Sequence, residues 1–183
     1  MRSALFVLVL LGCYHWTMST EAKTPRVPVI SFIDGKQSMD LSQYVGKPVL
    51  VVNIATRCGF TPQLKTLEAL YKKYKERGLV VVGIPSNDFG GQTPEDEKEV
   101  KKICSSNYGV TFPLTVKTTV KGKGKHPVIT YIMSLAESQD EIGWNFEKFL
   151  IDKSGQKATR FGSRVEPDSS EIIKKIEENL PKK

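Results

Sequence analysis

Two short apolar runs define the centre of the chain, and a helical pattern separates them. Residues 49–54 are apolar except for Asn53, and residues 79–85 are almost entirely apolar and rich in valine. Continuous β-branched runs of this length are typical of strands that are buried on both faces. Between them, the apolar positions of residues 67–74 recur at the spacing of one helix face. The pattern therefore predicts a β-α-β unit with parallel strands.

Two predicted hairpins flank this unit. Residues 29–41 contain an Asp-Gly turn between two short extended stretches, and residues 146–161 have the same character around Ser154-Gly155. A β-α-β unit that is followed by a β-β-α unit is the thioredoxin arrangement. The sequence thus predicts an α/β, thioredoxin-like fold, with a central mixed sheet flanked by helices and an N-terminal β-hairpin.

Two helix starts are predicted from capping residues. Thr93 is expected to cap a helix with Pro94 at its first position, and Cys104 would lie on the apolar face of that helix. The last helix is expected to begin at a capping box formed by Asp168 and Glu171.

The first 22 residues differ in composition from the rest. Arg2 precedes an apolar core over residues 4–12, which has the length of a signal-peptide core and is too short to span a bilayer. We therefore expect a signal peptide and a secreted or periplasmic protein. The predicted organisation is a leader over residues 1–22, a proline-containing linker over residues 23–28 and one domain over residues 29–183.

Two other interpretations of the leader stay open. Residues 10–13 read Leu-Leu-Gly-Cys, which resembles a bacterial lipoprotein box and would place a lipid anchor on Cys13. Alternatively, translation from Met18 would give a cytosolic protein.

Composition excludes some function classes. The 183 residues carry a formal charge of +7, three cysteines and two histidines. The cysteines and histidines are too few, at their spacing, for a zinc site, and no nucleic-acid-binding motif is present. Four lysines crowd the stretch from Lys117 to Lys125. This stretch is expected to be a solvated loop, with weak contact to an acidic partner or an anionic surface as the alternative.

Cys58 has the clearest chemical signal. It follows the first buried strand at the point where a helix begins, and α/β folds place ligands and chemistry at this edge of the sheet. The amide dipoles of the helix, with Arg57 as an assistant, would support a thiolate. Thr61 stands where a dithiol oxidoreductase has its second cysteine, so a lone reactive thiol suited to peroxide cleavage is expected. The alternative is an inert buried cysteine.

Peroxide cleavage also needs donors that orient the peroxide and stabilise the departing oxygen. Gln92 follows the second strand and is expected at the same sheet edge as Cys58. Trp144 offers an indole N–H and Asn145 an amide, so all three candidates are neutral donors. Each of them alone could equally be a structural residue.

Three segments resemble the signature blocks of the glutathione peroxidase family, in the order and at the spacing of that family. They are residues 53–63, 85–92 and 144–152. The resemblance extends from about residue 29 to the last helix. It implies that Cys58 is the peroxidatic residue and that the catalytic tetrad is completed by Gln92, Trp144 and Asn145.

A cysteine at position 58 makes the chain similar to the non-selenium branch of that family. The resemblance implies a resolving cysteine in the helix that follows, which matches Cys104, and a thioredoxin-like reductant in preference to glutathione. A buried Cys104 is not expected to reach Cys58 unless that helix partly unwinds. The long insertion of tetrameric members is missing, which favours a monomer. A purely structural role for Cys104 stays open.

Three positions depart from the family pattern. Asp88 stands where glutamine is common, Thr93 where glutamate is common, and Ser86 where a cysteine is frequent. Asp88 is close to Gln92 in sequence, so its charge could oppose a thiolate on Cys58.

The sequence thus predicts a thiol peroxidase that reduces hydrogen peroxide or organic hydroperoxides. Cys58 would form a sulfenic acid, Cys104 would convert it to a disulfide, and a thioredoxin-like protein would reduce that disulfide. No metal, flavin or nucleotide cofactor is implied. One alternative is a redox relay that passes the oxidation to a partner protein. Another is a non-enzymatic surface protein that binds through the lysine-rich loop.

Overall fold

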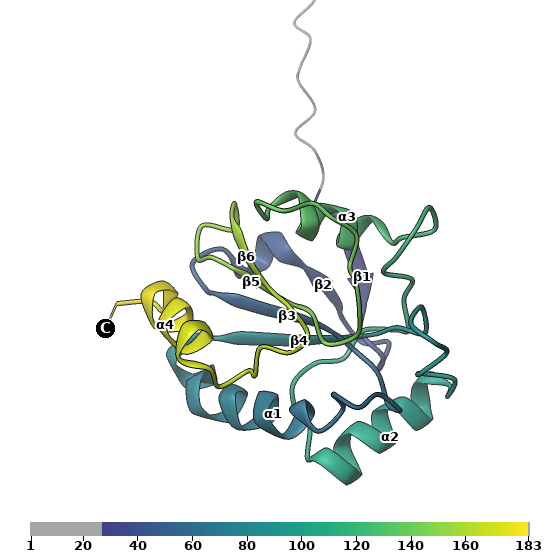
Figure 1. Ribbon diagram of the computed structural model, residues 1–183. Helices are drawn as coiled ribbons and strands as arrows, with labels where there is room; N and C mark the ends of the chain where they lie inside the picture. Colours follow the sequence, from purple (N-terminus) through teal and green to yellow (C-terminus); the bar gives the residue numbers. More distant parts are fainter. Residues whose placement is uncertain (1–26, 183) are drawn as a thin grey trace, which may run out of the picture.

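A four-stranded mixed sheet lies at the centre of the computed structural model, which describes residues 27–182 (Figure 1). β3 pairs in parallel with β4 on one side and antiparallel with β5 on the other, and β5 pairs antiparallel with β6. In order across the sheet the strands are β4 (Val80–Pro85), β3 (Val49–Ile54), β5 (Lys148–Ile151) and β6 (Ala158–Phe161).

Helices cover both faces of this sheet (Figure 1). They are α1 (Gln63–Tyr74), α2 (Glu97–Tyr108), α3 (Pro127–Ser134) and α4 (Ser170–Asn179), with short 3-10 turns η1 (Leu41–Tyr44) and η2 (Lys75–Arg77). Leu50 and Val52 of β3 pack in one apolar cluster with side chains of α1, α2 and α4. Val49 and Val51 pack in a second cluster, with side chains of α3 and the N-terminal hairpin. β3 is therefore buried on both faces, as its unbroken apolar run predicts.

The predicted N-terminal hairpin is present as β1 (Val29–Ser31) and β2 (Ser38–Asp40), which pair antiparallel. The α/β class and the parallel β-α-β unit are confirmed as well, and the antiparallel pair β5–β6 followed by α4 supplies the β-β-α unit of the predicted thioredoxin-like arrangement. Within the described residues, no helix is long and apolar enough to cross a membrane. The predicted leader over residues 1–22 lies outside the described part of the chain.

Both predicted helix starts are wrong by a short distance. α2 begins at Glu97, and its N-cap is Asp96, whose carboxylate accepts the Glu99 N–H at 2.8 Å. Thr93 is instead fixed in the preceding loop, because its N–H donates to the Asn87 side chain at 2.8 Å. Pro94 therefore also precedes the helix.

The cap of α4 is Ser169 rather than Asp168. The Ser169 hydroxyl accepts the Ile172 N–H at 3.4 Å. Aspartate and serine cap helices about equally well, and here the Ser169 N–H closes a turn on the Glu166 carbonyl at 3.0 Å. That turn makes Ser169, and not Asp168, the capping residue directly before the helix.

Candidate active site

The three segments with the predicted site residues meet at one edge of the sheet. The loops that follow β3 and β4 leave the same edge because these two strands are parallel. The segment before β5 arrives there because β5 runs antiparallel to β3, with Lys148 opposite Val52. The directions of the paired strands thus bring residues that are far apart in the sequence to one edge of the sheet.

Cys58 lies in the tight turn between β3 and α1 and is only 8 % exposed. Its Sγ accepts the backbone N–H of Phe60 at 3.5 Å, a donor that can support a thiolate. Thr61 accepts the Cys58 N–H at 2.9 Å and donates its hydroxyl to the Ala55 carbonyl at 3.0 Å. The residue in the place of a second active-site cysteine therefore fixes the shape of the turn.

Gln92 joins this turn to the third segment. Its backbone carbonyl accepts the N–H groups of Thr56 at 3.2 Å and Arg57 at 3.0 Å, just before Cys58. Its side-chain Oε1 accepts the Asn145 Nδ2 at 2.9 Å. Two of the predicted donors are therefore in direct contact, and one of them is bonded to the turn of Cys58.

Asn145 and Trp144 are placed differently around this contact. Asn145 is fully buried, and its Oδ1 has no hydrogen-bond partner within residues 27–182. Trp144 is 41 % exposed, and its ring lies against Phe89 of the Gln92 loop, with ring centroids 5.8 Å apart. Trp144 is therefore a surface aromatic residue beside the site and not a core residue.

Asn53 anchors the segment that carries Trp144 and Asn145. The Asn53 Nδ2 donates to the Trp144 carbonyl at 3.1 Å, and its Oδ1 accepts the Glu147 N–H at 2.9 Å. Its backbone carbonyl accepts the Phe146 N–H at 2.7 Å. Phe146 has a φ of +65°, a conformation that non-glycine residues rarely adopt, and these bonds hold it there.

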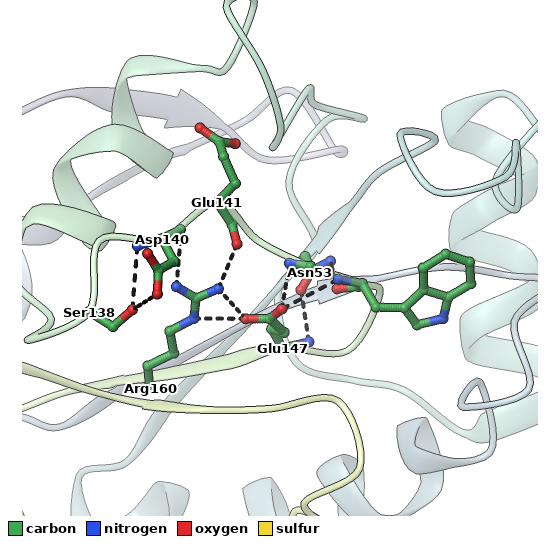
Figure 2. A network of polar contacts seen from close by, with 8 residues as sticks. Asn53, Ser138, Asp140, Glu141, Glu147 and Arg160 are labelled. Carbon is green, nitrogen blue, oxygen red and sulfur yellow. Dashed lines mark hydrogen bonds and ion pairs between the residues drawn. The ribbon is translucent and has the colours of Figure 1, made fainter.

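A largely buried ion pair between Glu147 and Arg160 holds the same segment from its other side (Figure 2). Glu147 Oε1 accepts the backbone N–H of Gly143 at 2.6 Å and that of Trp144 at 3.3 Å. Its Oε2 pairs with Arg160 Nη2 at 2.7 Å, and Arg160 Nη1 donates to the Asp140 carbonyl at 2.6 Å. Asn53, Glu147 and Arg160 are not among the residues that the sequence predicts for the site. Asn53 had a signal, because it is the one polar residue in an otherwise apolar strand.

Residues 29–133 match the family model described as glutathione peroxidase. The chain belongs to the glutathione peroxidase family. The matched range includes Cys58, Gln92 and Cys104 and ends before Trp144. The resemblance found in the sequence is confirmed, and a member of this family is a peroxidase, an oxidoreductase.

Individual members of the glutathione peroxidase family are similar over most of their length. Glutathione peroxidase-like peroxiredoxin GPX5 of Chlamydomonas reinhardtii is 52 % identical over 126 residues, which cover 68 % of this chain and 78 % of that protein. Glutathione peroxidase-like peroxiredoxin HYR1 of Saccharomyces cerevisiae is 44 % identical over 149 residues, or 77 % and 91 % of the two chains. The crystal structure of Trgpx in apo form superposes with a TM-score of 0.64 at 34 % identity and covers 85 % of this chain and 97 % of that one.

Arg57, the predicted assistant of the thiolate, is directed at a carboxylate. Its Nε donates to Glu95 Oε1 at 2.6 Å, and Thr56 Oγ1 donates to Glu95 Oε2 at 2.5 Å. Burial disfavours the Glu95 carboxylate, yet the bonds from Thr56 and Arg57 and the Arg57 charge outweigh this and lower the pKa of Glu95. The positive charge beside Cys58 is therefore largely compensated by Glu95.

Cys104, the predicted resolving residue, lies in α2 and is completely buried. It belongs to the same apolar cluster as Cys58, and both cysteines are free thiols. Burial, and after it the charge of Glu95, raises the pKa of Cys104 to about 12. In the reduced protein Cys104 is thus an uncharged thiol, which is unreactive until its surroundings change.

Asp88, the unusual acid of the Gln92 loop, is turned toward the lysine-rich loop. Its Oδ2 accepts the backbone N–H groups of Val120 at 2.5 Å and Lys121 at 3.2 Å. The Lys121 ammonium also lies over the Phe89 ring, 5.5 Å from its centroid. The Asp88 carboxylate therefore already accepts hydrogen bonds from two backbone amides of the lysine-rich loop.

The lysines between 117 and 125 do not form one uniform patch. Lys117 Nζ donates to the Glu95 carbonyl at 2.7 Å, and Lys125 Nζ pairs with Glu141 at 2.5 Å. Lys121 and Lys123 are exposed.

Across residues 27–182, no group of three or more histidine, cysteine or acidic side chains is arranged to hold a metal ion.

Proposed function

We propose that this glutathione peroxidase family member reduces hydrogen peroxide or organic hydroperoxides with Cys58 as the attacking thiol. The observation that carries the proposal is the double contact of Gln92, which bonds the turn before Cys58 with its carbonyl and Asn145 with its side chain. These bonds join the segment that carries the thiol to the segments that carry two neutral amide side chains, and a thiol with neutral donors is the combination that peroxide cleavage requires. The family membership and the relatives named peroxiredoxins support the same reaction.

The chemistry of the first step follows from these groups. The Cys58 thiolate attacks one peroxide oxygen, and the O–O bond breaks. The second oxygen takes up a proton and leaves as water or as an alcohol, while Cys58 becomes a sulfenic acid. The Phe60 N–H supports the thiolate, and the amide and indole donors of Gln92, Asn145 and Trp144 stabilise the departing oxygen.

In the second step, the Cys104 thiolate attacks the Cys58 sulfur. The S–O bond breaks, and hydroxide combines with the proton released by Cys104, so that a Cys58–Cys104 disulfide and water are formed. Disulfide geometry requires Cα atoms within about 7 Å. Because Cys104 is completely buried in a regular helix, α2 has to unwind in part for this step. A thioredoxin-like protein then reduces the disulfide.

The test is peroxide turnover by purified protein, supplied either with thioredoxin and its reductase or with glutathione. Wild type should turn over with thioredoxin, and much more slowly with glutathione. Cys58→Ser should be inactive, and Cys104→Ser should react once and then stop. Full activity in Cys58→Ser would end the proposal. Sustained thioredoxin-dependent turnover in Cys104→Ser would remove the resolving role, and a mixed disulfide with another protein would favour the relay.

Assembly, surface contact and location also belong to this proposal. The protein acts as a monomer, which size-exclusion chromatography at micromolar concentration checks. Weak contact with an anionic surface would use the Lys117–Lys125 loop, in which Lys121 and Lys123 are exposed. Residues 1–22 direct the protein to the periplasm or the cell exterior. Fusing the first 25 residues to a reporter separates this from a lipid anchor at Cys13 and from a cytosolic product that starts at Met18.

A further inference from the structure

Glu95 lies between the segments that carry the two cysteines. Its two carboxylate oxygens accept from Thr56 and Arg57, the two residues before Cys58. In the chain, Glu95 stands two positions before the first residue of α2, the helix of Cys104. The carboxylate therefore ties the turn of one cysteine to the start of the helix that holds the other.

The Glu95 carboxylate in this contact is charged and buried. The Glu95 side chain is 8 % exposed, whereas that of Arg57 is 66 % exposed. A buried carboxylate is stable only while its hydrogen bonds are satisfied. If the Glu95 side chain moves away, its contacts with Thr56 and Arg57 are therefore lost together. Hydrogen bonds to a charged acceptor are also stronger than those between neutral groups.

The surrounding contacts brace both ends of α2. Near its start, the Lys117 ammonium donates to the Glu95 carbonyl at 2.7 Å. Beyond its end, the Glu68 carboxylate of α1 accepts the backbone N–H of Thr111 at 2.7 Å and its hydroxyl at 2.6 Å. Of these two braces, only the one at Glu95 contacts the turn of Cys58. Opening at that end would release the start of α2 from the Cys58 turn, while the Gln92 carbonyl still accepts the N–H groups of Thr56 and Arg57.

We propose that Glu95 is a positioning residue that keeps the reduced enzyme closed, and that its release from Thr56 and Arg57 opens α2 for disulfide formation. The inference rests on the proposed resolving role of Cys104. It deepens that role, because it makes the lifetime of the Cys58 sulfenic acid depend on a carboxylate that touches neither peroxide nor sulfur. A stronger interaction of Glu95 with Thr56 and Arg57 would lengthen the lifetime of the sulfenic acid, and a weaker interaction would increase the rate of disulfide formation.

The first test needs no peroxide. In the reduced full chain with Cys13→Ser and Cys58→Ser, N-ethylmaleimide can modify only Cys104, and mass spectrometry follows the rate. Because Cys104 is completely buried, this rate reports local opening. Glu95→Gln should accelerate the modification about tenfold, since it weakens two charge-assisted hydrogen bonds. Thr56→Val leaves the Glu95 charge and removes the hydroxyl that donates to Glu95 and, at 3.2 Å, to the Gln92 carbonyl. It should accelerate the modification about threefold.

Glu99→Gln is the matched control. It removes the same charge from the start of α2, but the partner of Glu99 is Lys102 on the same helix. Its modification rate should equal that of the parent chain. Equal rates for Glu95→Gln and Glu99→Gln would overturn the proposal. Acceleration by Glu95→Gln with no effect of Thr56→Val would also overturn it, because the charge alone would then be responsible.

A second measurement separates local opening from general loss of stability. Amide hydrogen exchange in β3 reports global unfolding, and exchange in α2 reports the local event. Glu95→Gln should raise exchange in α2 and leave β3 unchanged, while a parallel rise in both would contradict a local tie. With the cysteines restored, one equivalent of peroxide should give a faster Cys58–Cys104 disulfide in Glu95→Gln. If no disulfide forms even in wild type, the resolving role fails, whatever the modification rates show.

Discussion

Lys148 allows a quantitative prediction about the fold beneath the site. It lies in β5, is completely buried, and donates from Nζ to the carbonyls of Val165 at 2.6 Å and Ser163 at 3.1 Å. The Ser163 carbonyl also accepts the Gln63 Nε2 at 2.9 Å, at the first residue of α1. The loop that Lys148 holds therefore helps to fix the helix that follows Cys58.

Burial lowers the pKa of Lys148 from 10.5 to about 8, against the opposing charges of Glu166 and Glu147. The difference between these values corresponds to about 3 kcal/mol at 1.36 kcal/mol per pKa unit, and solvent screening reduces the measurable part to about 2 kcal/mol. Below the folded-state pKa, the lysine is protonated in both states and its burial cost is constant. Between the folded and unfolded values the unfolded chain binds more protons, so stability rises with pH.

The perturbation is Lys148→Met, which removes the titrating group and keeps much of the side-chain volume. The free energy of unfolding is measured with urea for both proteins between pH 7 and pH 10.5. The stability of wild type relative to Lys148→Met should rise by about 2 kcal/mol across this range. A difference that stays constant with pH, or falls, would refute the assignment of a buried, depressed lysine.

The remaining predictions concern contacts around the site. Asn145→Ala and Gln92→Ala should each slow the reaction with peroxide about tenfold in stopped-flow measurements, and the double variant should be little slower than either, because the two share one hydrogen bond. Fully multiplicative effects would contradict that contact. Arg160→Met leaves the Glu147 carboxylate without its cation and should lower urea stability by about 3 kcal/mol, whereas unchanged stability would mean that the pair contributes nothing. The pKa of Glu68 lies below 4.5 because the bonds from Thr111 and Lys72 outweigh the effect of burial. The ionised carboxylate therefore stabilises the fold above that pH. The difference in the free energy of unfolding between wild type and Glu68→Gln, measured with urea, should shrink as the pH falls through the folded-state pKa. An equal difference at pH 7 and pH 3 would contradict a stabilising role of the ionised Glu68 carboxylate.

The fold and the meeting of the site segments could be predicted because they depend on patterns along the chain. The apolar runs around Val51 and Val82 define two central strands, and parallel pairing then places Cys58 and Gln92 at one edge. The helix starts were wrong where good capping residues stand close together. Asp96 and Ser169 are the caps, and the choice between neighbours depends on loop hydrogen bonds that periodicity does not contain.

The direction of a charged side chain was the part that could not be predicted. Arg57 stands next to Cys58 in the sequence, but its partner Glu95 lies 38 positions further along the chain. Asp88 similarly binds amides 32 and 33 positions away. The support of Trp144 by Glu147 and Arg160 depends on the antiparallel pairing of β5 with β6, which places Arg160 opposite Phe149. Such contacts follow from the folded arrangement and not from local sequence.

Trapping the first oxidised state tests the role of Cys58 most directly. Cys104→Ser is reduced, treated with one equivalent of hydrogen peroxide in the presence of dimedone, and digested for mass spectrometry. We expect a dimedone adduct on Cys58 in nearly stoichiometric amount, formed far more slowly when Asn145→Ala is added. Consumption of peroxide with Cys58 unmodified would contradict its assignment as the peroxide-reducing thiol.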